Sequence, residues 1–153
     1  MLKETLQEDL KAAMRAKDEV RLRTVRALRA ALMEKEIELR QGGEATLTSD
    51  QEMAVVQKQA KQRRDAMEQF RAAAREDLAT KEADELAVID EYLPTQLGEA
   101  ELEAIVRAVV AATGATGMKE MGRVMGPAMG KVAGRADGRR VQAAVKAILE
   151  GLG

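Results

Sequence analysis

Hydrophobic residues recur every three or four positions along most of this sequence, and polar residues fill the positions between them. That spacing is the period of an amphipathic helix, whereas no long stretch shows the alternation typical of a strand. The pattern predicts helices over residues 2–17, 18–39, 49–74, 77–93, 102–112, 118–132 and 137–149. We therefore expect an all-α fold.

Residues typical of helix ends support several of these boundaries. Asp18, Asp77 and Asp137 each stand where a side-chain oxygen can accept a hydrogen bond from the first free N–H groups of a helix. The segment 49–52, which runs from a serine to a glutamate, matches a capping box at the start of the third helix. Pro94 ends the fourth helix, because the residue before a proline is pushed out of the α region.

The segment 94–98 is the expected boundary between two domains. Residues 1–93 carry 17 basic and 20 acidic side chains, whereas residues 94–153 carry 8 basic and 6 acidic ones, so the net charge changes sign at this segment. We expect an N-terminal four-helix domain over 1–93, a hinge at 94–98 and a small C-terminal three-helix domain over 99–153.

The composition limits the possible chemistry. The chain has no His, Cys or Trp and only one Tyr and one Phe, while 33% of its residues are charged. Without imidazole or thiol groups, the usual nucleophile pairs, zinc sites and disulfides are excluded, so we expect no catalytic residue, no metal and no cofactor. There is neither a secretory signal nor a run of about 18 apolar residues, which predicts a cytoplasmic protein without membrane contact.

A cluster of cations lies between residues 115 and 146, where the acids are Glu120 and Asp137. Such a local excess of positive charge can attract a polyanion, and it can equally be the solvated face of a Lys/Arg-rich helix pair. The candidate nucleic-acid-binding residues are Lys119, Arg123, Lys131, Arg135, Arg139, Arg140 and Lys146.

A line of glycines runs beside these cations, at Gly122, Gly126, Gly130 and Gly134. Each Gly inside a helix costs roughly 1 kcal/mol relative to Ala, so something should offset the penalty. One explanation is close helix packing, and the other is a bare ridge that receives a sugar–phosphate backbone. Pro127 can break the helix, which would scatter the basic side chains. The predicted apolar side of this helix consists of Met118, Met121, Met125, Ala128 and Val132.

The segment 134–140 has two interpretations. A loop that opens into a helix offers free N–H groups and a positive dipole end, which suit an anion, and Arg135, Arg139 and Arg140 stand beside them. Asp137 can satisfy the same N–H groups as an N-cap, which would make the segment a structural turn.

Arg63 interrupts the apolar side of the third helix. The aliphatic part of its side chain can lie on the apolar surface while the guanidinium reaches solvent. Alternatively, the guanidinium can pair with a buried carboxylate or face a partner molecule. We expect it to point inward, or into the groove between the third and fourth helices, and to meet a carboxylate of the fourth. The available acids are Asp84, Glu85, Asp90 and Glu91.

Three segments, taken in order, resemble signature stretches of the YqeY-like family. They are Lys61–Asp65 with its continuation to Arg75–Leu78, then Glu91–Leu97, then Gly134–Gly138, and the resemblance extends from residue 2 to residue 149. This family is similar to the C-terminal tail of GatB, a subunit of the bacterial tRNA-dependent amidotransferase. The resemblance implies an all-helical fold of two parts and a role in tRNA recognition, because the GatB tail helps to recognise the body of the tRNA.

The resemblance also implies a link to glutamine-dependent tRNA amidation, a carbon–nitrogen ligase reaction with glutamine as amido-N-donor. The catalytic part of GatB has no counterpart in these residues, so we interpret the chain as non-catalytic by itself. One hypothesis is a bacterial module that binds tRNA or another structured RNA and works with amidotransferase or aminoacyl-tRNA machinery. The alternative is a helical protein–protein interaction module without nucleic-acid binding. The scarcity of aromatic residues means that any RNA contact should be directed to backbone and shape.

Overall fold

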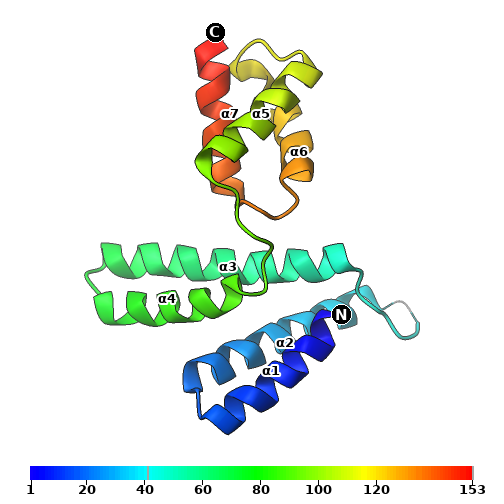
Figure 1. Cartoon of the computed structure of the whole chain (residues 1–153), viewed down its shortest axis with the longest axis vertical. Helices are drawn as coiled ribbons and strands as arrows, with labels where there is room; N and C mark the ends of the chain where they lie inside the picture. The colour runs from blue at the N-terminus through cyan, green and yellow to red at the C-terminus, as the bar shows by residue number, and fades with distance from the viewer. Residues whose placement is uncertain (41, 153) are drawn as a thin grey trace. The chain divides into compact units, whose positions relative to one another are not determined.

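A computed structural model describes residues 1–40 and 42–152. These residues form α-helices and one short 3₁₀-helix with no strand among them, so the all-α prediction is confirmed (Figure 1). The elements are α1 (Leu2–Ala16), α2 (Glu19–Leu39), α3 (Ser49–Ala72), α4 (Glu76–Asp90), α5 (Glu99–Thr113), η1 (Met118–Glu120), α6 (Met121–Val132) and α7 (Gly138–Leu152).

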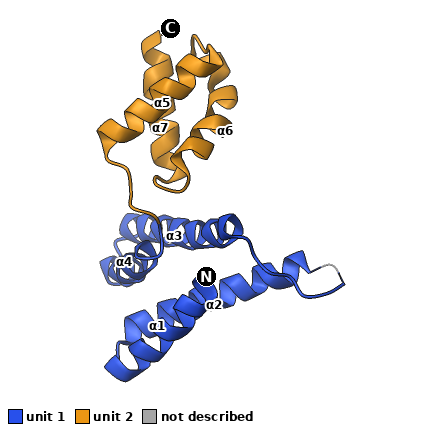
Figure 2. Ribbon diagram, turned by 45° about the vertical axis from the view of Figure 1, so that its right-hand side comes forward, with its two compact units in different colours: residues 1–93 blue, residues 94–153 orange. Residues whose placement is uncertain are grey.

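Contacts between residues divide the chain into two compact units (Figure 2). Unit 1, Met1–Leu93, contains α1 to α4, and unit 2, Pro94–Gly153, contains α5, η1, α6 and α7. That the two units fold as separate domains around a hinge at 94–98 stays a prediction. Limited proteolysis of the native protein tests it, because we expect cleavage within 94–98 to precede cleavage inside either unit.

Two helical hairpins form unit 1. α1 packs against α2 and α3 packs against α4, while α2 also contacts α3 and α4 (Figures 1 and 2). Lys17 ends α1 in the left-handed conformation, with φ of 56°, and the Oδ1 atom of Asp18 accepts a hydrogen bond from the Arg21 amide at 3.0 Å, so α2 begins where predicted. The buried core consists of Leu6, Val25, Leu28, Leu32, Leu47, Val55, Val56, Ala60, Val88 and Ile89.

Polar contacts also join the two hairpins of unit 1. The Tyr92 hydroxyl donates a hydrogen bond to the carboxylate of Asp9 on α1. Partial burial, together with this hydrogen bond, raises the pKa of Tyr92. The Nη1 atom of Arg21 on α2 lies 2.6 Å from the Oε2 atom of Glu91, which follows α4. These contacts fix the end of α4 against α1 and α2.

The predicted capping box of the third helix is wrong by one residue. Thr48 and Gln51 form it instead of Ser49 and Glu52: the Thr48 Oγ1 atom accepts from the Gln51 amide at 3.2 Å, and the Gln51 Oε1 atom accepts from the Thr48 amide at 2.9 Å. Glu52 has a different role, because its side chain is buried and its Oε2 atom accepts a hydrogen bond from the Leu2 amide at the start of α1, at 3.2 Å. A residue of α3 therefore satisfies an N–H group at the N-terminus of α1.

The fourth helix also begins and ends earlier than predicted. α4 begins at Glu76, so Asp77 lies in its first turn, where the carboxylate binds the guanidinium of Arg75 at 3.1 Å instead of capping the helix. The hydrogen bond from Arg75 lowers the pKa of the Asp77 carboxyl. α4 ends at Asp90, and residues 91–93 form a turn before Pro94.

In unit 2, α6 and α7 pack against each other, and both contact α5. Gly114 ends α5 in the left-handed conformation, with φ of 70°, which glycine adopts without strain. The Leu97 amide donates a hydrogen bond to the Arg135 carbonyl at 2.7 Å, which joins the segment before α5 to the loop before α7. The buried core consists of Leu97, Leu102, Val106, Val109, Val110, Ala115, Val124, Ala128, Val132, Ala136, Val141, Val145, Ile148 and Leu149.

Candidate nucleic-acid interface

The glycines of α6 lie on the solvent side of the helix. Gly122, Gly126 and Gly130 are exposed, and a Cβ atom added to any of them would meet no neighbouring atom within 4 Å. The explanation by close helix packing is therefore wrong. The residues that α6 buries against its neighbours are Val124, Ala128 and Val132, which also recur every four residues but on the opposite side. We call the three exposed glycines the glycine ridge.

Pro127 does not break this helix. α6 continues from Met121 to Val132 with the proline inside it, so the ridge runs along one uninterrupted helix. Pro127 is an exposed residue of this helix, and it has no N–H group to donate to the preceding turn. α6 ends at Val132, and the next two residues, Ala133 and Gly134, both have positive φ. Gly134 therefore belongs to the end of the helix and not to the ridge.

Cations lie near the glycine ridge, at Lys119 in η1 and at Arg123 and Lys131 in α6. Lys119 and Lys131 are exposed, and the ammonium group of neither forms a hydrogen bond or ion pair with any residue in 1–40 or 42–152. Arg123 donates a hydrogen bond to the carbonyl of Thr113 at the end of α5. That acceptor is neutral, so Arg123 is held in place and keeps its positive charge. All three cations remain able to attract an anion.

The loop before α7 is a structural turn. The Asp137 Oδ1 atom accepts a hydrogen bond from the Arg140 amide at 2.9 Å, so Asp137 caps α7 as predicted and occupies an N–H group that an anion would need. Arg135 turns back to the end of α6, where its guanidinium donates to the carbonyls of Val132 and Lys131, both at 3.1 Å. A cation there complements the negative end of the helix dipole. The anion-site interpretation of residues 134–140 has no support in this geometry.

The cations of α7 take part in internal contacts. Arg140 donates to the Leu97 carbonyl at 2.7 Å and lies 3.0 Å from the Oε1 atom of Glu99, so it fastens the start of α5 to α7. The Lys146 Nζ atom lies 4.0 Å from the Oε1 atom of Glu150. Arg139 is exposed in the first turn of α7 and also interacts with other residues. Of the predicted cations, Arg140 and Lys146 therefore each have a carboxylate close by.

The structure separates the predicted cations into groups near the two ends of α6. Lys119 lines a hollow with Glu150, the partner of Lys146, near the start of α6. Lys131 and Arg135 lie at the other end, before Arg139 and Arg140 in the first turn of α7. The glycine ridge connects the two ends, since α6 is about 18 Å long at 1.5 Å per residue.

Arg63 lies in unit 1 and takes no part in this surface. Its side chain is 15% exposed, its Nη1 atom donates to Gln59 Oε1 at 2.8 Å, and its Nε atom lies 3.4 Å from the Oε2 atom of Glu85 on α4. Glu85 is itself buried, and its other oxygen, Oε1, accepts a hydrogen bond from the Nε atom of Arg23 on α2 at 2.7 Å. One carboxylate thus joins guanidiniums from two helices. The sequence pattern did not indicate Arg23, because it lies on the exposed side of α2.

Among residues 1–40 and 42–152, no group of acidic side chains has the arrangement needed to hold a metal ion. In the same part of the chain, no helix combines the length and the apolar character required to cross a membrane. The ion pairs of Glu85 with Arg23 and Arg63 join α4 to α2 and α3.

Known proteins similar to this chain give a family and a set of relatives. A sequence model of the family described as Yqey-like protein matches residues 3–149. A protein of Pyrenophora tritici-repentis, named altered inheritance of mitochondria protein 41, mitochondrial, is 36% identical over 108 residues, covering 69% of this chain and 57% of the relative. The protein of the same name from Kluyveromyces lactis is 35% identical over 105 residues, covering 69% of this chain and 55% of the relative. The one from Saccharomyces cerevisiae is 39% identical over 88 residues, covering 58% of this chain and 46% of the relative.

These relatives correct two expectations. The chain spans about half the length of the curated relatives it matches. Their names are mitochondrial, which contradicts the predicted cytoplasmic location. That prediction relied on the lack of a secretory signal and of a membrane-spanning segment, and neither feature distinguishes the cytoplasm from the interior of an organelle. The relatives are also fungal, so the expected bacterial origin has no support.

Proposed function

The chain belongs to the YqeY-like family, and on that premise we propose that it is a non-catalytic module that binds structured RNA, with tRNA as the first candidate. The proposed surface is the glycine ridge of α6 with Lys119, Arg123 and Lys131 beside it. The link to glutamine-dependent amidation enters through this tRNA contact, in the way that the resemblance to the GatB tail implies. The amide-transfer chemistry would belong to a partner in the amidotransferase or aminoacyl-tRNA machinery.

The exposure of the glycine ridge is the observation that carries this proposal. Glycines inside a helix lower its stability by roughly 1 kcal/mol each relative to alanine. Gly122, Gly126 and Gly130 receive no packing energy in return, because the space around each is open. A surface that gives up stability without an internal benefit is expected to bind something. Removing side chains from a helix lets a bulky ligand come close to the helix backbone.

The charges beside the ridge favour a polyanion as that ligand. Neither Lys119 nor Lys131 forms an ion pair with a carboxylate among the described residues, and the hydrogen bond of Arg123 goes to a neutral carbonyl. Phosphate groups would be attracted to this surface, and most contacts of this kind position a nucleic acid without reading its sequence. The lack of aromatic side chains in unit 2 agrees with contacts to backbone and shape.

Replacing Lys119 and Lys131 by glutamine should weaken tRNA binding roughly tenfold at low salt. Each lost phosphate contact should also reduce the slope of log affinity against log salt by about 0.7–0.9. Fluorescence anisotropy with a labelled tRNA, repeated over a range of salt concentrations, measures both quantities. Because the two side chains are exposed and unpaired, the variant should keep the unfolding midpoint of the native protein.

A matched control removes the same charge from unit 1. Lys58 and Lys81 are exposed lysines whose side chains form no hydrogen bond or ion pair with the described residues, and we expect their replacement by glutamine to leave tRNA affinity nearly unchanged. Equal losses in the two double variants would mean that binding follows overall charge rather than this surface. In that case the proposed RNA surface on α6 would be wrong.

A further inference from the structure

The outer side of α2 carries large apolar side chains that nothing in unit 1 covers. Met33 is 55% exposed and Ile37 is 59% exposed, and with the exposed Ala30 they follow the spacing of one helix face. Leu28 and Leu32 of the same helix point into the core, so α2 is apolar on two sides. We call Ala30, Met33 and Ile37 the α2 stripe.

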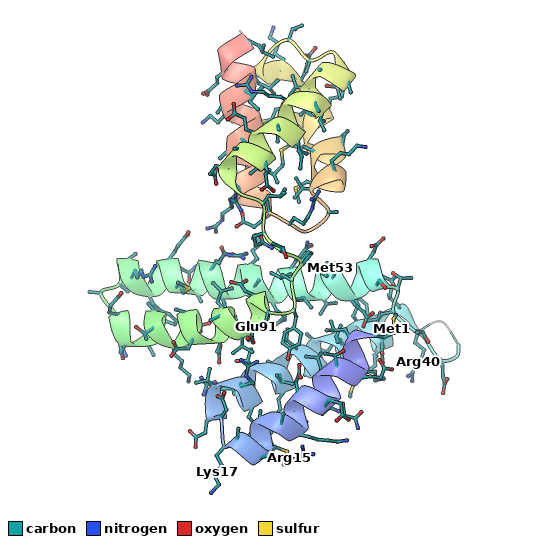
Figure 3. The ribbon with its side chains drawn as sticks, in the orientation of Figure 1. Met1, Arg15, Lys17, Arg40, Met53 and Glu91 are labelled. Atoms are coloured by element: carbon teal, nitrogen blue, oxygen red, sulfur yellow. The ribbon has the colours of Figure 1, made fainter. Side chains whose placement is uncertain are left out.

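A groove runs beside the α2 stripe. It has a volume of about 290 Å³ and lies between the start of α1, where Lys3 lines it, and the part of α2 from Arg26 to Glu36. The buried Leu32 and the exposed Met33 are among its lining residues. Its exposed wall is mostly apolar. Figure 3 labels Met1 and Arg40 at one end of the α1–α2 hairpin, and Arg15 and Lys17 at the other end.

The polar rim of the groove is positively charged. Arg26 and Arg29 line it, and the guanidinium of neither forms a hydrogen bond or ion pair with any residue in the described parts of the chain. Lys3 lies 3.4 Å from Glu36, the single carboxylate among the lining residues. The groove therefore combines an apolar wall with two unpaired guanidiniums, although unit 1 as a whole is acidic.

We propose that this groove binds an amphipathic helix of a partner protein, with apolar residues on one face and carboxylates along its edge. The apolar face would cover Met33 and Ile37, and the carboxylates would pair with Arg26 and Arg29. The charge complementarity decides the chemistry of the partner, because a basic helix would meet two uncompensated arginines. Methionine suits such a surface, since its flexible thioether adapts to different apolar neighbours.

The apolar wall argues against RNA as the occupant of this groove. A phosphate backbone would cover Met33 and Ile37 without gaining apolar contact, and no aromatic side chain lines the groove for a base to stack on. The proposal is therefore independent of the RNA surface on α6. A chain can have both surfaces, one in each unit, and each can fail without the other.

Two synthetic peptides provide the test with the full-length protein. Both are helical, of about 18 residues, with leucines at the spacing of one helix face; one carries glutamates beside that face and the other carries lysines. Fluorescence anisotropy should show that the acidic peptide binds at least tenfold more tightly than the basic one. Met33→Ser with Ile37→Ser should reduce acidic-peptide binding at least tenfold, whereas Met14→Ser, which changes a methionine of α1 that is also 55% exposed, should not.

Charge reversal makes the test stricter. Arg26→Glu with Arg29→Glu should invert the preference, so that the basic peptide binds more tightly, while the control Arg15→Glu with Lys17→Glu should leave the preference unchanged. Circular dichroism confirms that each variant is folded before binding is measured. The proposal is overturned if neither peptide binds, if both bind equally, or if the preference survives the reversal. It is also overturned if the Met33 and Ile37 change abolishes self-association or tRNA binding instead, since the groove would then belong to a second copy or to RNA.

Discussion

Replacing Gly122, Gly126 and Gly130 together by alanine should make unit 2 more stable and at the same time weaken tRNA binding. Each added methyl group enters open space, so the change brings the helix propensity of alanine without a clash. At up to about 1 kcal/mol per site, the sum should be roughly 2 kcal/mol, less at Gly122 because it lies in the first turn of α6. Urea unfolding followed by circular dichroism measures the gain.

The binding loss should arise from distance alone, because the triple change removes no charge. Three methyl groups would hold a phosphate backbone away from the helix surface, and we expect at least a tenfold loss of tRNA affinity. Gly151→Ala is the matched control: Gly151 is also helical, exposed and surrounded by open space, but it lies near the end of α7. A triple variant that is stabilised and binds tRNA normally would remove the glycine ridge from the interface.

Replacing Glu85 by alanine should destabilise unit 1 by about 2–4 kcal/mol. The change leaves the guanidiniums of Arg23 and Arg63 without their shared carboxylate, and Arg63 is too buried to be well solvated. Breaking one partner of a buried pair costs about 3–5 kcal/mol, and we reduce this range because the Arg23 side chain is 42% exposed. Denaturant unfolding measures the loss.

Glu91→Ala provides the comparison for this prediction. Glu91 pairs with Arg21 at 2.6 Å, but its side chain is 53% exposed, so its loss should cost at most about 1 kcal/mol. Arg63→Met combined with Glu85→Leu should recover much of the lost stability, because a buried pair can be replaced by apolar residues of similar volume. Similar losses for Glu85→Ala and Glu91→Ala would show that the buried contact has no special weight.

The helices could be predicted from the sequence because each buries one regular side. The prediction of the buried side failed where more than one apolar side was compatible with the sequence. The methionine-rich segment 118–132 offered several apolar lines, and the predicted one omitted Val124, which is fully buried, and included Met118, which is 40% exposed. The rotation of α6 about its own axis decides whether the glycines face a neighbouring helix or solvent. Only the packed structure placed them in solvent.

The roles of individual charges depended on contacts that are distant in sequence. Arg140 reaches the Leu97 carbonyl and Glu99, which stand about 40 positions earlier, and nothing in the local pattern indicates this contact. The sequence indicated that Arg63 would meet a carboxylate of α4, yet several acids were available, and the rotation of α4 selected Glu85. In the cap of α3, Thr48 and Ser49 are adjacent and chemically equivalent, so sequence alone could not choose between them.

The most direct test of the account is to observe the ridge glycines while tRNA is added. Backbone amide resonances of glycine fall in a separate region of the ¹⁵N–¹H NMR spectrum, so Gly122, Gly126 and Gly130 can be followed in the native protein. We predict that these resonances shift or broaden at low salt, that those of Gly43 and Gly151 do not, and that added salt reverses the effect. Unchanged ridge resonances in the presence of saturating tRNA, or changes confined to unit 1, would contradict the account.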